Sequence, residues 1–271
     1  MTAALRYEWR RLWTIRSTYW LIAMTLGLQA VLTFLVAWGI SSDGNIEDAA
    51  DEVMSAVITL GASFGRSPLF TAYFIAMFGV LSFGHEYRYG MIRATLTAVP
   101  NRTAVFVAKA VVTALVAAVL SMLCSLIGMF WSWVFISETA DALGSGEVWG
   151  VVVGATLYTV LFALWALGVT CLVRNQTGAL ALVLLVPLVL ENVLRIILQV
   201  LANLGNNNLD EIAKVFPFDA GAQMYVGPGA ELLNEVLQYE PLSGVGGGLV
   251  MLGFVAALLA AAYALFLSRD A

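Results

Sequence analysis

Residues 19–40 read YWLIAMTLGLQAVLTFLVAWGI, a continuous apolar run without a charged side chain. About 20 predominantly apolar residues in a helix are enough to cross the hydrocarbon core of a bilayer. Tyr19, Trp20 and Trp38 lie near the two ends of the run, where aromatic side chains prefer the membrane–water interface. The stretch therefore predicts a transmembrane helix.

The composition of the whole chain agrees with a lipid environment. Of its 271 residues, 61% are hydrophobic and only 11% are charged, whereas roughly a quarter of the residues of a soluble domain are charged. Further spans are predicted at about 68–84, 106–134, 148–173, 178–202 and 245–267. We therefore predict an all-α integral membrane protein, one domain with six transmembrane helices. Cys124 and Cys171 lie inside apolar runs, so we expect no disulfide framework and no metal site.

The segment before the first span is amphipathic. Within residues 2–16, apolar side chains recur at i, i+4, i+7 and i+8, namely Leu5, Trp9, Leu12 and Trp13. The nearby arginines fall largely off this stripe. A basic amphipathic helix of this kind lies in the headgroup layer with its apolar face toward the lipid tails. We therefore expect an interfacial helix and contacts with membrane lipids.

Charge is distributed unequally between the two sides of the predicted membrane. One side holds ten of the thirteen basic residues: Arg6, Arg10, Arg11, Arg16, Arg88, Arg93, Arg102, Lys109, Arg174 and Arg269. Of the eighteen acidic residues, only Glu8, Glu86 and Asp270 lie on that side. Because basic residues mark cytoplasmic loops, we predict a multi-pass protein of the plasma (inner) membrane with both termini in the cytoplasm. We expect Lys109 to extend toward the inner headgroups.

The residues needed for several kinds of chemistry are missing from the sequence. Neither Lys109 nor Lys214 follows a glycine, so the chain has no phosphate-binding P-loop for ATP. The single histidine, His85, rules out a two-histidine zinc motif, and we interpret it as an interfacial side chain. We therefore expect a chain that is not an enzyme by itself, that holds no cofactor or metal, and that binds no nucleic acid.

Few charged residues fall inside the predicted spans. Glu191 and Arg195 are the main ones, one helical turn apart and shortly after Pro187. They could line or gate a transport pathway, as ionisable residues inside a membrane often do. Alternatively, they form a structural i,i+4 ion pair near the outer leaflet. The sequence leaves both interpretations open.

The stretch that carries a family motif is FGHEYRYGMIRATLTAVPNR, residues 83–102. It is basic, lies on the predicted cytoplasmic side within the segment 85–103, and is mildly amphipathic. A short helix should end before Pro100, because the residue that precedes a proline disfavours the helical conformation. Such a helix between two spans offers a docking surface for a cytoplasmic partner.

In this stretch the chain resembles the membrane (permease) subunits of type-2 ATP-binding-cassette exporters. Their pattern F-x-x-E-x-x-x-G-T-[LI], followed by a leucine and P-x-x-R, is matched in order by Phe83, Glu86, Gly90, Ile92, Leu96 and Pro100. Met91 replaces the usual threonine, and the arginine falls one place early, at Arg102. The resemblance implies six spans, a cytoplasmic coupling helix between spans two and three, and external or re-entrant helices in segment 203–244.

The resemblance also implies partners. The arrangement that it implies is a homodimer, or a pair of related permeases, bound to two ATPase subunits, with ATP and Mg²⁺ on the partner chains. The residues implied to couple this chain to the ATPase are Glu86, Tyr87, Arg88, Gly90, Arg93, Leu96 and Pro100. For Glu86 we expect a contact that links span two to the coupling helix or to the ATPase. The alternative is a helix N-terminal residue favoured by the macrodipole.

A transport pathway between two subunits would be mainly apolar. The candidate lining residues are Phe34, Phe70, Tyr73, Phe74 and Phe78, which suits export of a hydrophobic or amphipathic substrate. The main alternative is a stand-alone secondary transporter or channel, which the scarcity of ionisable groups within the membrane disfavours. There are two further alternatives. One is an intramembrane enzyme, and the other is a permease relative that serves sensing or immunity without transport.

Overall fold

The computed structural model of the chain describes residues 2–41, 50–60, 70–203, 208–226 and 241–268. Every regular element within these ranges is a helix, and no strand occurs in them. The first half contains α1 (Thr2–Thr14), α2 (Arg16–Ser41), α3 (Ala50–Leu60), α4 (Phe70–Arg88), α5 (Ile92–Ala98) and α6 (Arg102–Phe135). The second half contains η1 (Ser137–Gly144), α7 (Gly146–Val173), α8 (Gln176–Leu185), η2 (Val186–Glu191), α9 (Asn192–Asn203), α10 (Asn208–Ala213), α11 (Pro217–Ala222) and α13 (Gly244–Ser268).

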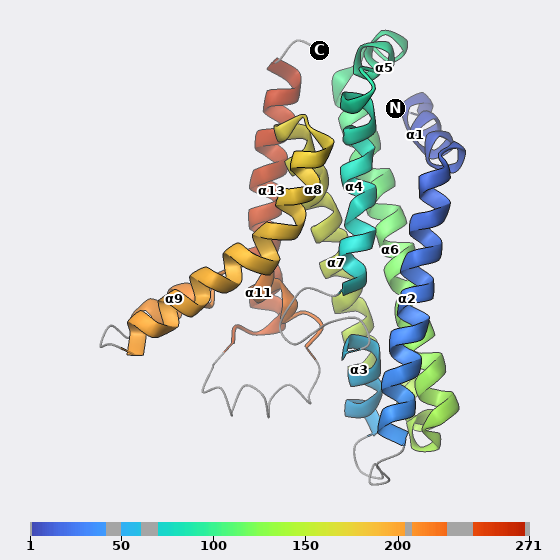
Figure 1. Ribbon diagram of the computed structural model, residues 1–271, viewed down its shortest axis with the longest axis vertical. Helices are drawn as coiled ribbons and strands as arrows, with labels where there is room; N and C mark the ends of the chain where they lie inside the picture. Colours follow the sequence, from blue (N-terminus) through green and yellow to red (C-terminus); the bar gives the residue numbers. More distant parts are fainter. Residues whose placement is uncertain (1, 42–49, 61–69, 204–207, 227–240, 269–271) are drawn as a thin grey trace.

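Five helices in the described ranges are long and apolar enough to cross a bilayer. They are α2, α6, α7, the run through α8 and α9 as far as Leu198, and α13. The remaining predicted span corresponds to α4, which is 19 residues long and ends in polar residues. Figure 1 shows α4 standing alongside α7 within the bundle. The all-α membrane fold is confirmed, while the count of six spans stays a prediction.

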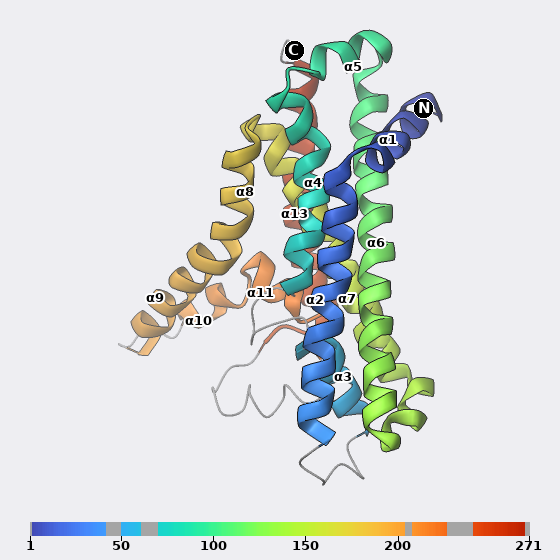
Figure 2. The same ribbon diagram turned by 45° about the vertical axis from the view of Figure 1, so that its right-hand side comes forward.

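Helix α6 is longer than one membrane crossing requires. Its 34 residues span about 51 Å at 1.5 Å per residue, against a hydrocarbon core of about 30 Å. Figure 2 shows it running along most of the bundle, with its C-terminal end packed against α3. The helix therefore extends beyond the predicted span 106–134 at both ends.

The core of the bundle is the contact between α4 and α7. A Cβ atom at Gly79 would overlap the backbone oxygen of Ala163, so only glycine allows the two backbones to approach this closely. Nearby, the Tyr73 ring meets the Phe162 ring edge-on at 5.1 Å. This contact makes α4 an integral part of the bundle.

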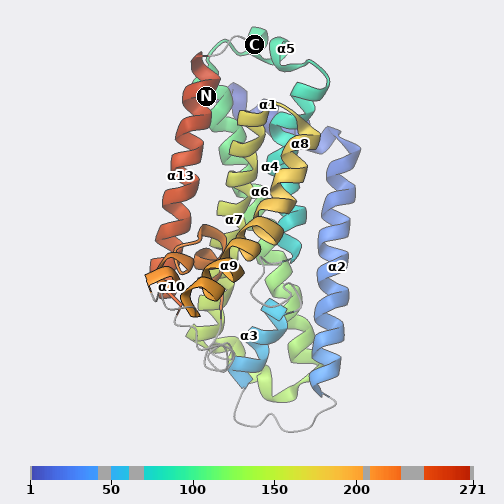
Figure 3. The ribbon, with the colours of Figure 1, turned by 60° about the vertical axis from the view of Figure 1, so that its left-hand side comes forward.

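Helix α1 and the C-terminal end of α13 lie at one end of the bundle, together with α5 (Figure 1). Arg102, the first residue of α6, joins this helix to the end of α13, because its Nη1 donates to the carbonyl oxygens of Phe266 at 3.3 Å and Leu267 at 3.2 Å. A cation is favourable at the C-terminal end of a helix such as α13. Figure 3 shows α2 and α13 on opposite sides of the bundle.

The predicted span 178–202 is not a straight helix. The chain adopts a π-helical turn from Val186 to Glu191, and Pro187 lies at its start. Proline removes a backbone donor and π-turns break the regular hydrogen-bond ladder, so the helix bends here. After this turn α9 points away from the bundle, as Figures 1 and 2 both show.

In the segment predicted as external, 203–244, the described residues form two short helices, α10 and α11. Residues 204–207 and 227–240 of this segment lie outside the described part of the chain. Helix α11 packs against α13 and α7, and the ring of Phe218 lies 4.7 Å from that of Trp165 on α7. Helix α11 is therefore folded onto the bundle.

Candidate coupling site

A buried ionic cluster joins three helices at the end of the bundle that carries α5. The side chain of Lys109 on α6 is fully buried, and Nζ donates three hydrogen bonds. It donates to Glu8 Oε1 on α1 at 2.7 Å, to Glu86 Oε1 on α4 at 2.7 Å, and to the backbone oxygen of Ser82 at 2.9 Å. An ammonium group has three N–H donors, so all of them are used.

Arg11 completes this cluster. Its guanidinium lies 3.0 Å from Glu8 Oε2 and 3.3 Å from Glu86 Oε1. Two cations therefore face two carboxylates, and the cluster carries no net charge. Glu86 and Glu8 are 1% and 2% exposed, a degree of burial that charged groups tolerate only when they are paired and hydrogen-bonded. The cluster ties α1 and α6 to the last turn of α4.

The position of Lys109 corrects the sequence interpretation. Its side chain does not extend toward the headgroups but points inward, where Nζ also lies 5.1 Å from the centre of the Phe83 ring. The physical reason is the acidic residue on α1. Glu8 follows Leu5 by three residues and precedes Leu12 by four, which puts a carboxylate on the face that α1 buries. Glu8, Arg11 and Lys109 are thus site residues that the sequence interpretation missed. The spacing of Glu8 from Leu5 and Leu12 could have indicated a buried carboxylate that needs a cation.

The position of Glu86 excludes one of the two sequence interpretations. It lies in the last turn of α4, not at a helix N-terminus, so the macrodipole does not favour it. Its ionic partners are Lys109 and Arg11, which belong to α6 and α1 and not to α5. Glu86 therefore fixes the helix that leads into α5, and its burial keeps it away from a partner protein.

The connection from α4 to α5 is a tight, sequence-specific turn. Gly90 has φ +65°, Gly90 N–H bonds to the oxygen of Tyr87, and Met91 N–H bonds to the oxygen of Glu86 at 2.8 Å. These two bonds form a Schellman motif, in which glycine is preferred because a side chain is strained at positive φ. The Gly90 of the family pattern therefore sets the angle between α4 and α5.

Helix α5 has an inner and an outer face. Ile92 and Thr95 are buried, with Ile92 in an apolar cluster that includes Phe83, Phe106 and Phe266. The Tyr7 hydroxyl on α1 lies 3.5 Å from Thr95 Oγ1. The end of the helix is followed by Pro100 and by Asn101, whose side chain accepts a hydrogen bond from Ala104 N–H and caps α6.

The seven predicted coupling residues lie at the end of α4, in the turn, in α5 and just after it, and they differ in exposure. Arg88, Gly90, Arg93 and Pro100 are exposed, while Tyr87 and Leu96 are half-buried and Glu86 is buried. The Tyr87 ring stacks on that of Phe83 at 6.0 Å, and burial raises the pKa of its hydroxyl well above the usual range. The four exposed residues therefore lie at the surface, whereas the buried and half-buried residues pack against the bundle next to α5.

His85 lies beside the ionic cluster and outside its hydrogen bonds. Partial burial, followed by the positive charges of Arg11 and Arg88, lowers the pKa of its imidazole. Its ring meets that of Tyr89 edge-on at 6.0 Å. A neutral ring that packs on an aromatic side chain at the end of the bundle agrees with its interpretation as an interfacial residue.

A family model described as ABC-2 family transporter protein matches residues 5–190. The chain belongs to this family. The match begins in α1 and ends in η2, so it includes the ionic cluster and α5. A search of curated proteins finds no match. The resemblance seen in residues 83–102 is confirmed, and the chain is a multi-pass permease subunit of an ATP-binding-cassette transporter.

In this permease, Glu191 and Arg195 do not form the predicted i,i+4 ion pair. Arg195 Nη1 pairs with Asp219 Oδ1 at 2.7 Å, and its Nη2 donates to Asn192 Oδ1. Glu191 accepts the backbone N–H of Asp219 at 2.7 Å and that of Phe218 at 3.4 Å. Both side chains bind α11, because the π-turn and the bend at Pro187 bring this end of the span against it. They act together as an anchor for α11.

The five aromatic residues predicted to line a pathway do not form one surface of the permease. Tyr73 and Phe78 are 5% and 2% exposed, so they pack within one chain in this conformation. Phe34 lies among the rings of Trp38, Trp131 and Phe135, between α2 and α6. Phe70 is 36% exposed and meets Phe74 edge-on at 5.6 Å. The difference within α4 follows from what each residue packs against, because Tyr73 is covered by Phe162 of α7, whereas Phe70 lies at the first position of α4.

Proposed function

We propose that the permease works as a homodimer with two separate ATPase subunits and exports a hydrophobic or amphipathic substrate from the cell. In this proposal both termini and α5 are cytoplasmic in the plasma (inner) membrane. ATP and Mg²⁺ bind the ATPase chains. The unequal distribution of basic residues along the sequence supports this orientation.

The observation that carries the proposal is the way α5 is held. Arg93 on α5 and Arg88 at the end of α4 are exposed, while the turn at Gly90 and the apolar contacts of Ile92 restrict the angle between α5 and α4. Such a short helix is exposed on one side and is rigidly joined to a long helix. It is suited to convert movement of a bound ATPase into movement of the long helix.

The ionic cluster extends this connection beyond α4. Glu86 leads into the α5 turn, and Lys109 joins it to α6 and α1. A displacement of α5 by the ATPase would therefore move the ends of three helices together. In a dimer, such a movement would open the space between subunits alternately to each side, with Phe70, Phe74 and Phe34 as the remaining candidates for its apolar lining.

The test is purification of the tagged permease from its native membrane, followed by identification and ATPase assay of the chains that accompany it. The wild type is compared with Arg93→Glu, which reverses a charge on the outer face of α5. The matched control, Asp141→Arg, reverses an exposed charge in η1, which is remote from α5 in sequence and packs on the distal end of α6. We expect an accompanying protein with a phosphate-binding P-loop, lost in Arg93→Glu and retained in Asp141→Arg.

Three results would contradict the proposal. A permease that purifies alone and moves substrate along an ion gradient in vesicles would be a secondary transporter. An ATPase retained equally by both variants would show that α5 is not the docking element. The oligomeric state is measured on the same samples by light scattering, and a monomer in the active complex would refute the homodimer.

A further inference from the structure

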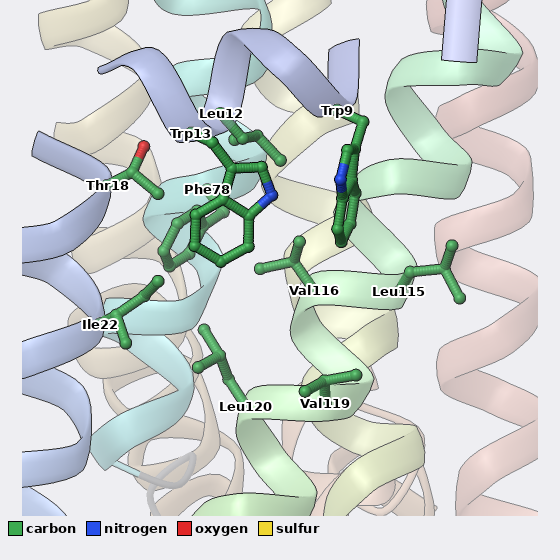
Figure 4. Close-up of a pocket in the computed structure, with 10 residues that line it drawn as sticks. All are labelled: Trp9, Leu12, Trp13, Thr18, Ile22, Phe78, Leu115, Val116, Val119 and Leu120. Carbon is green, nitrogen blue, oxygen red and sulfur yellow. The ribbon is translucent and has the colours of Figure 1, made fainter. Parts of the chain in front are cut away.

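A cavity of about 230 Å³ lies beneath α1, where α1, α2, α4 and α6 meet. Figure 4 shows Trp9 and Trp13 reaching down from α1, with Ile22 of α2 and Val116 and Leu120 of α6 below them. Phe78 of α4 forms part of the lining. Thr18 contributes the only hydroxyl group among the lining side chains, so the cavity is suited to hydrocarbon and not to a polar ligand.

The outer side of α1 places positive charge next to this cavity. Arg6 and Arg10 are exposed and lie one helical turn apart. By the 100° rotation per residue, Arg6 falls about 60° and Arg10 about 100° from Trp9 around the helix, with Trp13 at about 40°. Both arginines therefore lie on the same side of the two indole rings, the side away from Glu8.

We propose that this cavity binds one acyl chain of an anionic phospholipid whose phosphate lies at Arg6 and Arg10. The apolar lining selects the chain, and the arginines select the charge of the headgroup. Tryptophan rings at the boundary between tails and headgroups are favourable in this position, and anionic lipids of the cytoplasmic leaflet attract basic residues at its surface. This placement rests on the cytoplasmic orientation of α1 in the proposed function.

The bound lipid would act on coupling through α1. One face of α1 carries Glu8 and Arg11, which bind Glu86 and Lys109, and the neighbouring face covers the cavity. A lipid chain beneath Trp9 and Trp13 supports the helix from the membrane side while the ionic cluster holds it to the bundle. The lipid is thus a structural ligand that keeps α1 docked.

The first test counts lipids on the purified permease by native mass spectrometry, with phosphatidylglycerol or phosphatidylcholine added to the detergent. Val116→Trp fills the cavity and should abolish the bound lipid. The matched control is Val111→Trp, the same change on α6 at an exposed position that does not line the cavity. It should leave the lipid count unchanged. No ATPase is needed, so the result is independent of the partner proposed above.

The second test concerns the charge. Each basic residue near an anionic surface contributes about fivefold in affinity, so the double variant R6Q/R10Q should bind phosphatidylglycerol about 25-fold more weakly and phosphatidylcholine as before. R88Q/R93Q removes two exposed arginines at α5 as the control. Brominated phosphatidylglycerol should quench the fluorescence of the wild type more than that of W9F/W13F, which checks the position if Val116→Trp folds poorly.

Three outcomes would overturn the proposal. The first is unchanged lipid binding in a folded Val116→Trp. The second is an equal loss of both lipids in R6Q/R10Q. The third is a change from dimer to monomer in Val116→Trp without a change in lipid count, which would make the cavity a contact between subunits.

Discussion

Replacement of Lys109 by methionine tests the buried ionic cluster directly. Methionine has a similar length and no charge, so the change removes the ammonium and leaves most of the volume filled. Glu8 and Glu86 then lose a partner 2.7 Å away, while Arg11 remains 3.0 and 3.3 Å from them. Two carboxylates face one cation, and one buried negative charge is left uncompensated.

The expected loss of stability follows from that single charge. Removal of one partner from a buried ion pair costs about 3–5 kcal/mol, because the remaining charge stays desolvated. For a chain of this size, 1 kcal/mol corresponds to about 2–4 °C in melting temperature. We therefore expect Lys109→Met to lower the melting temperature by about 10 °C, and the double variant K109M/E86Q, in which Glu8 still faces Arg11, to recover much of this loss.

Thermal unfolding in detergent, followed by the loss of the monodisperse peak in size-exclusion chromatography, measures the effect. Lys214→Met is the matched control, because Lys214 pairs with Glu211, whose side chain is 73% exposed. Surface pairs of this kind contribute about 0–1 kcal/mol. The reasoning is refuted if Lys109→Met melts with the wild type, or if K109M/E86Q is less stable than K109M alone.

Three further variants test other parts of the fold. Gly90→Ala should destabilise the α4–α5 turn by about 1–2 kcal/mol, because alanine is strained at positive φ. It should lower the ATPase activity of the purified complex even at temperatures where the permease is still folded. Asn101→Ala removes the cap of α6 and should cost about 1 kcal/mol in thermal unfolding; no change would show that the cap contributes little. Arg195→Met removes the cation that lies 2.7 Å from the buried carboxylate of Asp219 and should cost about 3 kcal/mol, whereas a melting temperature equal to the wild type would exclude an anchoring role for the pair.

The membrane fold was predictable because it follows from local properties. A run such as residues 19–40 excludes a water-exposed helix by its composition alone. The short helix before Pro100 follows equally from the restriction that proline places on the preceding residue. Features of this kind depend on neighbours in the sequence and not on tertiary contacts.

The ionic cluster was not predictable in the same way, because its partners are far apart in the chain. Glu8 and Lys109 are separated by 101 positions, and nothing local distinguishes a lysine that reaches toward headgroups from one that turns inward. The same applies to Arg195, which has Glu191 one helical turn away yet pairs with Asp219. Local spacing identifies pairs that can meet, and tertiary contacts decide which of them do.

The position of Lys109 places a physical constraint on how the proposed coupling can operate. Its buried ammonium group binds α1 and α4 simultaneously at 2.7 Å, so a shift of α4 relative to α1 would stretch or break one of these contacts. Separation of Lys109 from a carboxylate would leave an unpaired charge in a low-dielectric environment, which is energetically costly. Movement of α5 should therefore carry α1, the end of α4 and the start of α6 as one body. The bend at Pro187 and the region around it, where the helix is already broken, are the better places for the chain to flex.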